Sequence, residues 1–242
     1  MHREIKKSYE YQDLRTLHQN MVLVLERFVT ESESRKQVSF LREIKRKLIL
    51  KVLELGLAEH LIPILPAIPM KCMKIERQMS FVSHYDKQGE VHLNSKQIKD
   101  LQNIPHFHPY WLIGVELEMD TIDTSPEQAT EIIIKKGRFP LTLSEIISLQ
   151  IHNYCLGSFS VQACGSIYQP FKGLEITSTP VVHLENNIPI ISWGPFKKNK
   201  EGDGFKPWVT PSCICRVGTL GVKTFIQGRW WKERRERREF EK

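Results

Sequence analysis

The segment that most restricts the fold is an apolar run in the middle of the 242-residue chain, from Tyr110 to Leu117, interrupted only by Gly114 and Glu116. A continuous apolar run of this length is typical of a strand that is buried on both faces. It is far shorter than the roughly 20 apolar residues that a helix needs to cross a bilayer. The sequence therefore predicts a buried strand here and no contact with a membrane.

Two helices are predicted before this strand, over residues 11–30 and 38–55. In both, apolar residues recur at three- and four-residue steps, which places them on one face of a helix. We expect the two helices to pack as an antiparallel pair. The segment LIPILPAIPM at residues 61–70 contains three prolines, which remove backbone donors and favour extended chain. Its apolar residues indicate that it lies against the body of the protein.

A third helix is predicted after the strand, over residues 125–137. Ser125 has the position of an N-cap and Pro126 that of the first helical residue, while Gly137 follows two lysines at the end. The segment TLSEIISLQIH predicts a fourth helix, because Thr142 and Glu145 have the spacing of a capping box.

Beyond about residue 158 the sequence predicts strands, because β-branched residues and partial alternation replace the helical period. Asn186 and Asn187 are typical of a tight turn between two of these strands. The predicted class is α+β: an N-terminal helical hairpin followed by a mostly antiparallel β-sheet domain with two short helices. The predicted parts are a helical region at 1–60, a connector at 61–104, an α+β domain at 105–228 and a charged C-terminal helix at 229–242.

Composition narrows the functional classes. The formal net charge of +7 permits a nucleic-acid or acidic partner, but acidic residues are mixed with the basic ones in residues 1–60 and 229–242. The five cysteines have no regular spacing, which favours reduced thiols over a disulfide framework. The first residues are charged and lack the apolar segment of a secretory signal, so we expect a cytoplasmic protein. No phosphate-binding glycine motif is present, and we expect no cofactor.

His106 and His108 alternate between Pro105 and Pro109, so both rings would project to one side of an extended segment. Two imidazoles can begin a metal site, but a catalytic zinc site needs at least a third protein ligand. The flanking prolines favour a rigid loop that leads into the buried strand.

The cysteines suggest two other sites. Cys213 and Cys215 form a C-x-C pair, which is a weak metal signal without a second pair. Cys164 precedes a glycine and could act as a nucleophile, with His152 or His183 as its base, and Cys213 is the other candidate thiol. Buried, inert cysteines are the commoner case, and the spacing selects neither histidine.

The order of five segments resembles an uncharacterised family of bacterial proteins, a domain of unknown function, over roughly residues 105–218. These segments are PYWLIGVELEMDT, SPEQATEIIIKKGRFPLTLSEIISL, ACGS, IPIISW and PSCICR, and GRFPLT is the most specific piece. The residues that match the family pattern are Pro109, Tyr110, Gly137, Arg138, Pro140, Leu141, Thr142, Trp193, Ser212 and Cys213. The histidine pair is not part of this pattern, and the C-x-C-Arg spacing departs from it. The resemblance implies no activity and no catalytic residue.

We interpret the chain as a bacterial binding or interaction module for a protein or small-molecule ligand. Arg138 follows a helix end, where a guanidinium can bind a carboxylate or phosphate, or form a structural ion pair that holds GRFPLT against the sheet. Tyr110 and Trp193 are the other expected ligand contacts. The alternatives are a hydrolase or transferase that uses Cys164 or Cys213, and a weak nucleic-acid binder that uses a basic surface.

Overall fold

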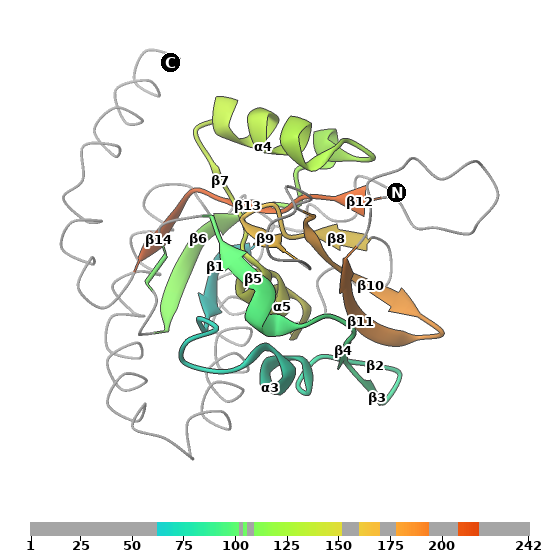
Figure 1. The fold of residues 1–242 in the computed structure, drawn as a ribbon. Helices are drawn as coiled ribbons and strands as arrows, with labels where there is room; N and C mark the ends of the chain where they lie inside the picture. The colour runs from blue at the N-terminus through green and yellow to red at the C-terminus, as the bar shows by residue number, and fades with distance from the viewer. Residues whose placement is uncertain are drawn as a thin grey trace, which may run out of the picture.

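The computed structural model of the protein describes residues 62–101, 104–105, 109–151, 160–169, 178–193 and 208–217, which are coloured in Figure 1. This part contains both helices and strands, which confirms the α+β class. The predicted helices over residues 11–30, 38–55 and 229–242 lie outside the described residues, as do His106, His108 and His152.

The predicted buried strand is β6 (Tyr110–Val115), and all six of its residues are buried. It is the central strand of a three-stranded antiparallel sheet, between β1 (Ile62–Ala67) and β14 (Cys215–Val217). The extended chain predicted from the three prolines is β1. Pro66 opposes Trp111 of β6. Proline is tolerated in this strand because β1 is an outer strand of its sheet within the described residues.

The second sheet has five strands in the order β12-β8-β10-β11-β4. These strands are β12 (Trp208–Val209), β8 (Ser160–Gln162), β10 (Pro180–Glu185), β11 (Ile188–Trp193) and β4 (Glu90–Val91). The predicted turn at Asn186 and Asn187 joins β10 to β11, and both asparagines have positive φ. Only the β12–β8 and β11–β4 pairs are parallel among the nine pairings of the described strands, so the sheets are mostly antiparallel, as predicted.

Three two-stranded ribbons complete the described strands. They are β2 (Ser83–His84) with β3 (Lys87–Gln88), β5 (Ile98–Asp100) with β9 (Ser166–Tyr168), and β7 (Phe139–Pro140) with β13 (Ser212–Cys213). Two 3-10 turns are η2 (Ser95–Gln97) and η3 (Met119–Thr121).

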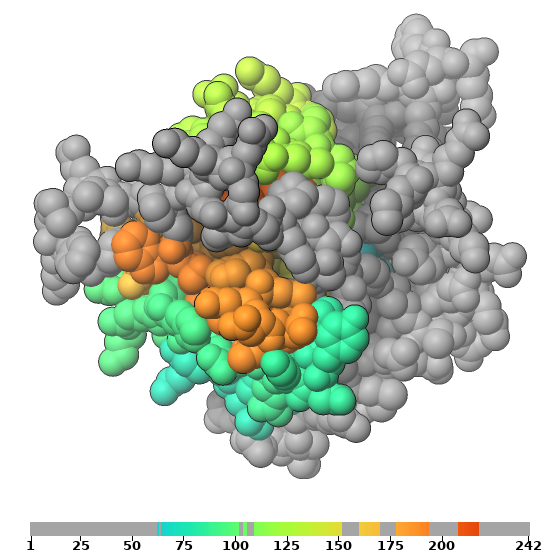
Figure 2. Space-filling model, turned by 90° about the vertical axis from the view of Figure 1, so that its right-hand side faces the viewer, coloured from blue at the N-terminus to red at the C-terminus, as the bar shows by residue number. Residues whose placement is uncertain are grey.

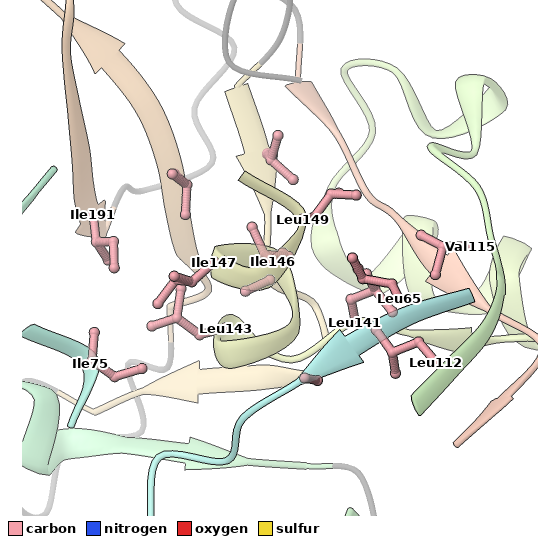
Figure 3. Packing of buried hydrophobic residues seen from close by; sticks show 14 of the residues in the cluster. Leu65, Ile75, Leu112, Val115, Leu141, Leu143, Ile146, Ile147, Leu149 and Ile191 are labelled. Atoms are coloured by element: carbon pink, nitrogen blue, oxygen red, sulfur yellow. The ribbon is translucent and has the colours of Figure 1, made fainter. Parts of the chain in front are cut away.

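The core surrounds α5 (Leu143–Ile151), which lies between the three-stranded and five-stranded sheets (Figures 1 and 3). Its apolar side chains meet Leu65 of β1, Leu112 of β6, Ile191 of β11 and Ile75 of α3 (Ile75–Met79) in one buried cluster. Because eight of its nine residues are buried, α5 has no solvated face, unlike an ordinary surface helix.

The helix predicted over residues 125–137 is α4 (Pro126–Lys135), which covers β7 and β13 in Figure 1. Ser125 Oγ accepts a hydrogen bond from Gln128 N at 3.3 Å, and the Gln128 side chain accepts one from Ser125 N. Gly137 ends the helical segment with φ of +68°, a conformation that a residue with a Cβ rarely adopts. Within the described ranges, no helix is both long and apolar enough to span a bilayer.

Candidate functional site

Arg138 directly follows Gly137, the glycine that ends α4. Its guanidinium is buried against the loop that follows β6. Its Nε lies 2.6 Å from Glu118 Oε1 and 2.6 Å from Ser212 Oγ. Its Nη2 donates to the Gly114 carbonyl at 2.6 Å. Ser212 Oγ in turn donates to Glu118. Protein groups thus occupy Nε and Nη2 of the guanidinium, and Nη1 lies 3.8 Å from Glu116 Oε2, so Arg138 is mainly engaged in contacts within the protein.

Lys136 is a partly exposed member of the same ion-pair group. Its Nζ lies 2.6 Å from Glu118 Oε2 and 2.8 Å from Asp120 Oδ2. Partial burial pushes the pKa of Lys136 downward, but its hydrogen bonds to Asp120 and Glu118 outweigh burial and raise the pKa above its ordinary value. Lys136 is therefore a charged bridge between the end of α4 and η3, and it is not a proton acceptor at neutral pH.

A second buried group joins Tyr110, Glu145 and Arg216. Arg216 binds the Glu145 carboxylate in a bidentate manner: its Nε donates to Oε1 at 2.5 Å and its Nη2 donates to Oε2 at 2.8 Å. Tyr110 Oη donates to the same carboxylate at 2.7 Å. Burial alone would raise the pKa of Glu145, but the Arg216 charge and these hydrogen bonds lower it below its ordinary value. Burial and the Glu145 charge raise the pKa of Tyr110 well above its ordinary range. Tyr110 is fully buried, so it presents no surface to a ligand.

The capping box predicted at the start of α5 is only half formed. Glu145 Oε2 accepts a hydrogen bond from Thr142 N at 2.7 Å, which is the expected return contact. The Thr142 hydroxyl is buried and makes no hydrogen bond to the described residues. The pattern identified the correct helix start, but Glu145 also belongs to the buried ion pair with Arg216.

The ribbon of β7 and β13 contributes residues to both ion-pair groups. Ser212 of β13 belongs to the first group, while the Pro140 carbonyl of β7 accepts a hydrogen bond from Arg216 at 2.9 Å in the second. Between Arg138 and Pro140, the Phe139 ring is 45% exposed and lies 5.8 Å from the Arg216 guanidinium carbon. The GRFPLT segment thus connects both charged groups and presents one aromatic ring outward.

The candidate thiols are buried. Cys164 is hydrogen-bonded to Gln162 and Thr210, and Cys213 belongs to the hydrophobic core. Burial raises the pKa of each of these two thiols to about 12. Burial also raises the pKa of Cys215 well above its ordinary value. A thiol is nucleophilic as the thiolate, so these environments suppress the reactivity that a catalytic cysteine requires.

Gly165, next to Cys164, has a packing role. A Cβ at this position would lie 2.7 Å from the Leu141 carbonyl carbon and oxygen, so the backbone of GRFPLT occupies that space. Gly165 N donates to the Leu141 carbonyl at 2.9 Å. The close approach that the glycine permits is to the backbone of Pro140 and Leu141 in the same protein.

The described histidines do not complete a thiol or metal site. His183 lies on β10 with Nδ1 3.4 Å from Ser192 Oγ, and burial lowers its pKa. No hydrogen bond joins His183 to Cys164 or Cys213. In the described ranges, no group of three or more histidine, cysteine, aspartate or glutamate side chains is arranged to hold a metal ion.

Trp193 ends β11 and is 40% exposed, with its ring 5.7 Å from that of Tyr168. Of the three expected ligand contacts, it has by far the most accessible side chain. Nothing in the described residues completes a ligand site around it.

Sequence reasoning missed the exposed apolar side chains near the end of α4. Met119 on η3, Ile134 on α4 and Phe139 on β7 are 38%, 59% and 45% exposed, and α4 contacts both other elements. A signal was available, because three consecutive isoleucines at residues 132–134 cannot all face inward on a helix. Ile133 is fully buried, whereas Ile134 is the exposed member.

The positive charge of the chain lies mainly outside the described part. The described residues carry ten Lys/Arg and twelve Asp/Glu, against 35 and 28 in the whole chain. The described body is therefore slightly acidic, and the basic surface expected for nucleic acid is not found on it.

Together these features define an α+β protein whose interior is tied by two buried arginine–glutamate pairs. The chain belongs to a family of unknown function, DUF5701, whose model matches residues 10–156. This match agrees with the resemblance to a domain of unknown function, but it begins far before residue 105 and ends before the sheet strands β8 to β14. No curated protein and no solved structure matches the sequence.

Proposed function

We propose that the protein is a bacterial cytoplasmic binding module that contacts a partner protein through an apolar surface at the end of α4. This α4-end surface consists of Met119, Ile134 and Phe139, which are half of the large exposed apolar side chains in the described residues. The element that carries Ile134, α4, contacts both η3 and β7, which carry the other two. Exposed apolar side chains that gather on one surface mark interaction sites more often than single scattered ones do.

The observation that carries the proposal is the rigid support beneath these side chains. Lys136 ties the end of α4 to η3 through Glu118 and Asp120, and Arg138 ties the start of β7 to the same glutamate. Phe139 lies over Arg216, whose guanidinium is held by Glu145. A surface that is already ordered loses little conformational entropy when it binds, which favours affinity.

Charged side chains lie on the same elements as the apolar ones. Lys135 and Glu131 form an exposed pair on α4, and Asp120 is half exposed beside Met119. A polar rim around an apolar centre sets orientation while the centre supplies most of the affinity.

The test is site-specific photo-crosslinking in the cell that makes the protein. A benzoylphenylalanine at position 134 should give a discrete adduct, whereas the same residue at Glu127, exposed on the same helix, should not. The adduct partner, once purified, should bind the Phe139→Ser variant at least about tenfold more weakly than the original protein. Unchanged affinity of the Phe139→Ser variant, or equal adducts at both positions, would contradict the proposal.

The two alternatives draw no support from the described residues. A thiol mechanism at Cys164 or Cys213 has neither a reactive thiol nor a hydrogen-bonded histidine base there. Nucleic-acid binding would have to use the basic segments outside the described residues, because the described body is slightly acidic.

A further inference from the structure

A second feature lies away from the α4-end surface, where the β2–β3 and β10–β11 hairpins end side by side. Figure 2 shows their teal-green and orange atoms as adjoining parts of one surface. Each hairpin closes with a two-residue turn in which both central residues have positive φ: Tyr85 and Asp86 in one, Asn186 and Asn187 in the other. We call residues 84–87 and 185–188 the paired turns.

Tyr85 is unusual at such a position. Glycine and asparagine adopt this conformation readily, whereas a bulky side chain at positive φ costs free energy. Its ring is 79% exposed, the most exposed large apolar side chain in the described residues, and it meets the His84 ring at 4.4 Å. The ring therefore contributes little to the core, and folding alone does not explain a tyrosine here.

The paired turns are held firmly. Lys87 Nζ donates to the Asn186 carbonyl at 2.8 Å and so links one turn to the other. At the base of the first hairpin, a Cβ on Gly89 would lie 2.8 Å from the Met79 carbonyl oxygen and 3.4 Å from that of Pro189. The backbone at Gly89 is thus pressed against α3 and β11, and Tyr85 stands on a rigid base.

The exposed charges on and beside the two hairpins are mostly negative. Asp86 and Glu185 are exposed carboxylates on the hairpins, and Glu90, on the neighbouring strand β4, is exposed and pairs with His92 at 2.9 Å. Lys87 is the only Lys or Arg on these strands and turns, and its ammonium is already bound to the Asn186 carbonyl. An aromatic face beside carboxylates attracts a cation, and a guanidinium can stack on the ring while it pairs with a carboxylate.

We propose that the paired turns are a contact site for an arginine-bearing peptide segment of a partner protein, with the Tyr85 ring stacked on a guanidinium. The site is separate from the α4-end surface and does not depend on it. The rigid ring supplies contact area at low entropic cost, and the carboxylates supply charge complementarity.

The test titrates the full ¹⁵N-labelled chain with an acetylated (Gly-Arg)₄ amide peptide and with its (Gly-Glu)₄ counterpart. The arginine peptide should shift the amide signals of residues 83–92 and 184–188, with affinity that falls as salt rises. The glutamate peptide should leave these signals unchanged. Tyr85→Phe should keep the affinity, whereas Tyr85→Asn should weaken it at least about fivefold.

Stability separates this role from a structural one. Tyr85→Asn should raise the melting temperature slightly while it weakens binding, because asparagine suits positive φ. Asn187→Gly is the matched control: it also relieves positive φ in the paired turns but should leave the affinity unchanged. The proposal is overturned if wild-type protein does not bind the arginine peptide at low salt, if Tyr85→Asn binds as tightly as wild type, or if Tyr85→Asn melts at a lower temperature.

Discussion

Replacing Arg216 with methionine should strongly destabilise the protein. The substitution removes both guanidinium contacts to Glu145, at 2.5 and 2.8 Å, and the hydrogen bond to the Pro140 carbonyl. Glu145 is fully buried and keeps only Tyr110 Oη and Thr142 N as partners. Breaking a buried ion pair from one side typically costs about 3–5 kcal/mol, because the remaining charge is uncompensated. For a chain of this size that corresponds to a melting temperature lower by roughly 10 °C.

Urea unfolding followed by tryptophan fluorescence would measure the loss. The Glu145→Gln and Arg216→Met double variant tests its cause, since a neutral amide can keep the contacts to Tyr110 and Thr142 without a buried charge. We expect the double variant to be more stable than Arg216→Met alone. A loss below about 1 kcal/mol in Arg216→Met, or a double variant as unstable as the sum of the two single variants, would refute the ion-pair reasoning.

The pH dependence gives an independent check. In the wild type the pKa of Glu145 is lower in the folded state than in the unfolded state. The pair therefore contributes stability above the unfolded pKa of that carboxyl, and the contribution is lost as pH falls through the folded pKa. Without Arg216, burial dominates and raises the folded pKa of Glu145. The stability difference between wild type and Arg216→Met should therefore shrink as the pH is lowered from 7 toward 4.

Three further outcomes follow from packing and burial. With thiol pKa values of about 12, Cys164 and Cys213 should resist iodoacetamide in native protein at pH 7.5, whereas the exposed Cys72 should react faster than either, as read by peptide mass mapping. Gln150→Leu should stabilise the fold by about 1–3 kcal/mol in urea unfolding, because both polar atoms of this buried amide lack partners among the described residues. Gly165→Ala should lower the stability by about 2 kcal/mol or more, because its Cβ would meet the Leu141 backbone at 2.7 Å; an unchanged unfolding midpoint would contradict that contact.

Three elements could be predicted from the sequence because each depends on the identity of a few neighbouring residues. The helix α4 could be predicted because Ser125, Pro126 and Gly137 each suit one position of a helix end. The strand β6 could be predicted because a central strand is apolar on both faces. The Asn186-Asn187 turn could be predicted because few residues other than glycine and asparagine tolerate positive φ.

The buried ion pairs could not be predicted in the same way. Glu118 and Arg138 are twenty residues apart, and Glu145 and Arg216 belong to segments separated by several strands. Their pairing depends on how β7 and β13 meet, which no local period encodes. For the same reason Arg138 was open to two interpretations, as a ligand contact or as a structural ion pair. The structure places it in a buried ion pair with Glu118.

The GRFPLT segment shows why a motif that suggests a family resemblance need not mark a functional site. Gly137 ends α4, Arg138 pairs with Glu118, the Pro140 carbonyl receives Arg216, and the Leu141 backbone fills the space beside Gly165. Each of these positions is determined by folding. Phe139 is the member whose side chain is substantially exposed, and the segment's buried contacts fix its position. Partner binding should therefore be tested at exposed side chains such as Phe139 and Ile134. The other residues of GRFPLT fix the position of Phe139.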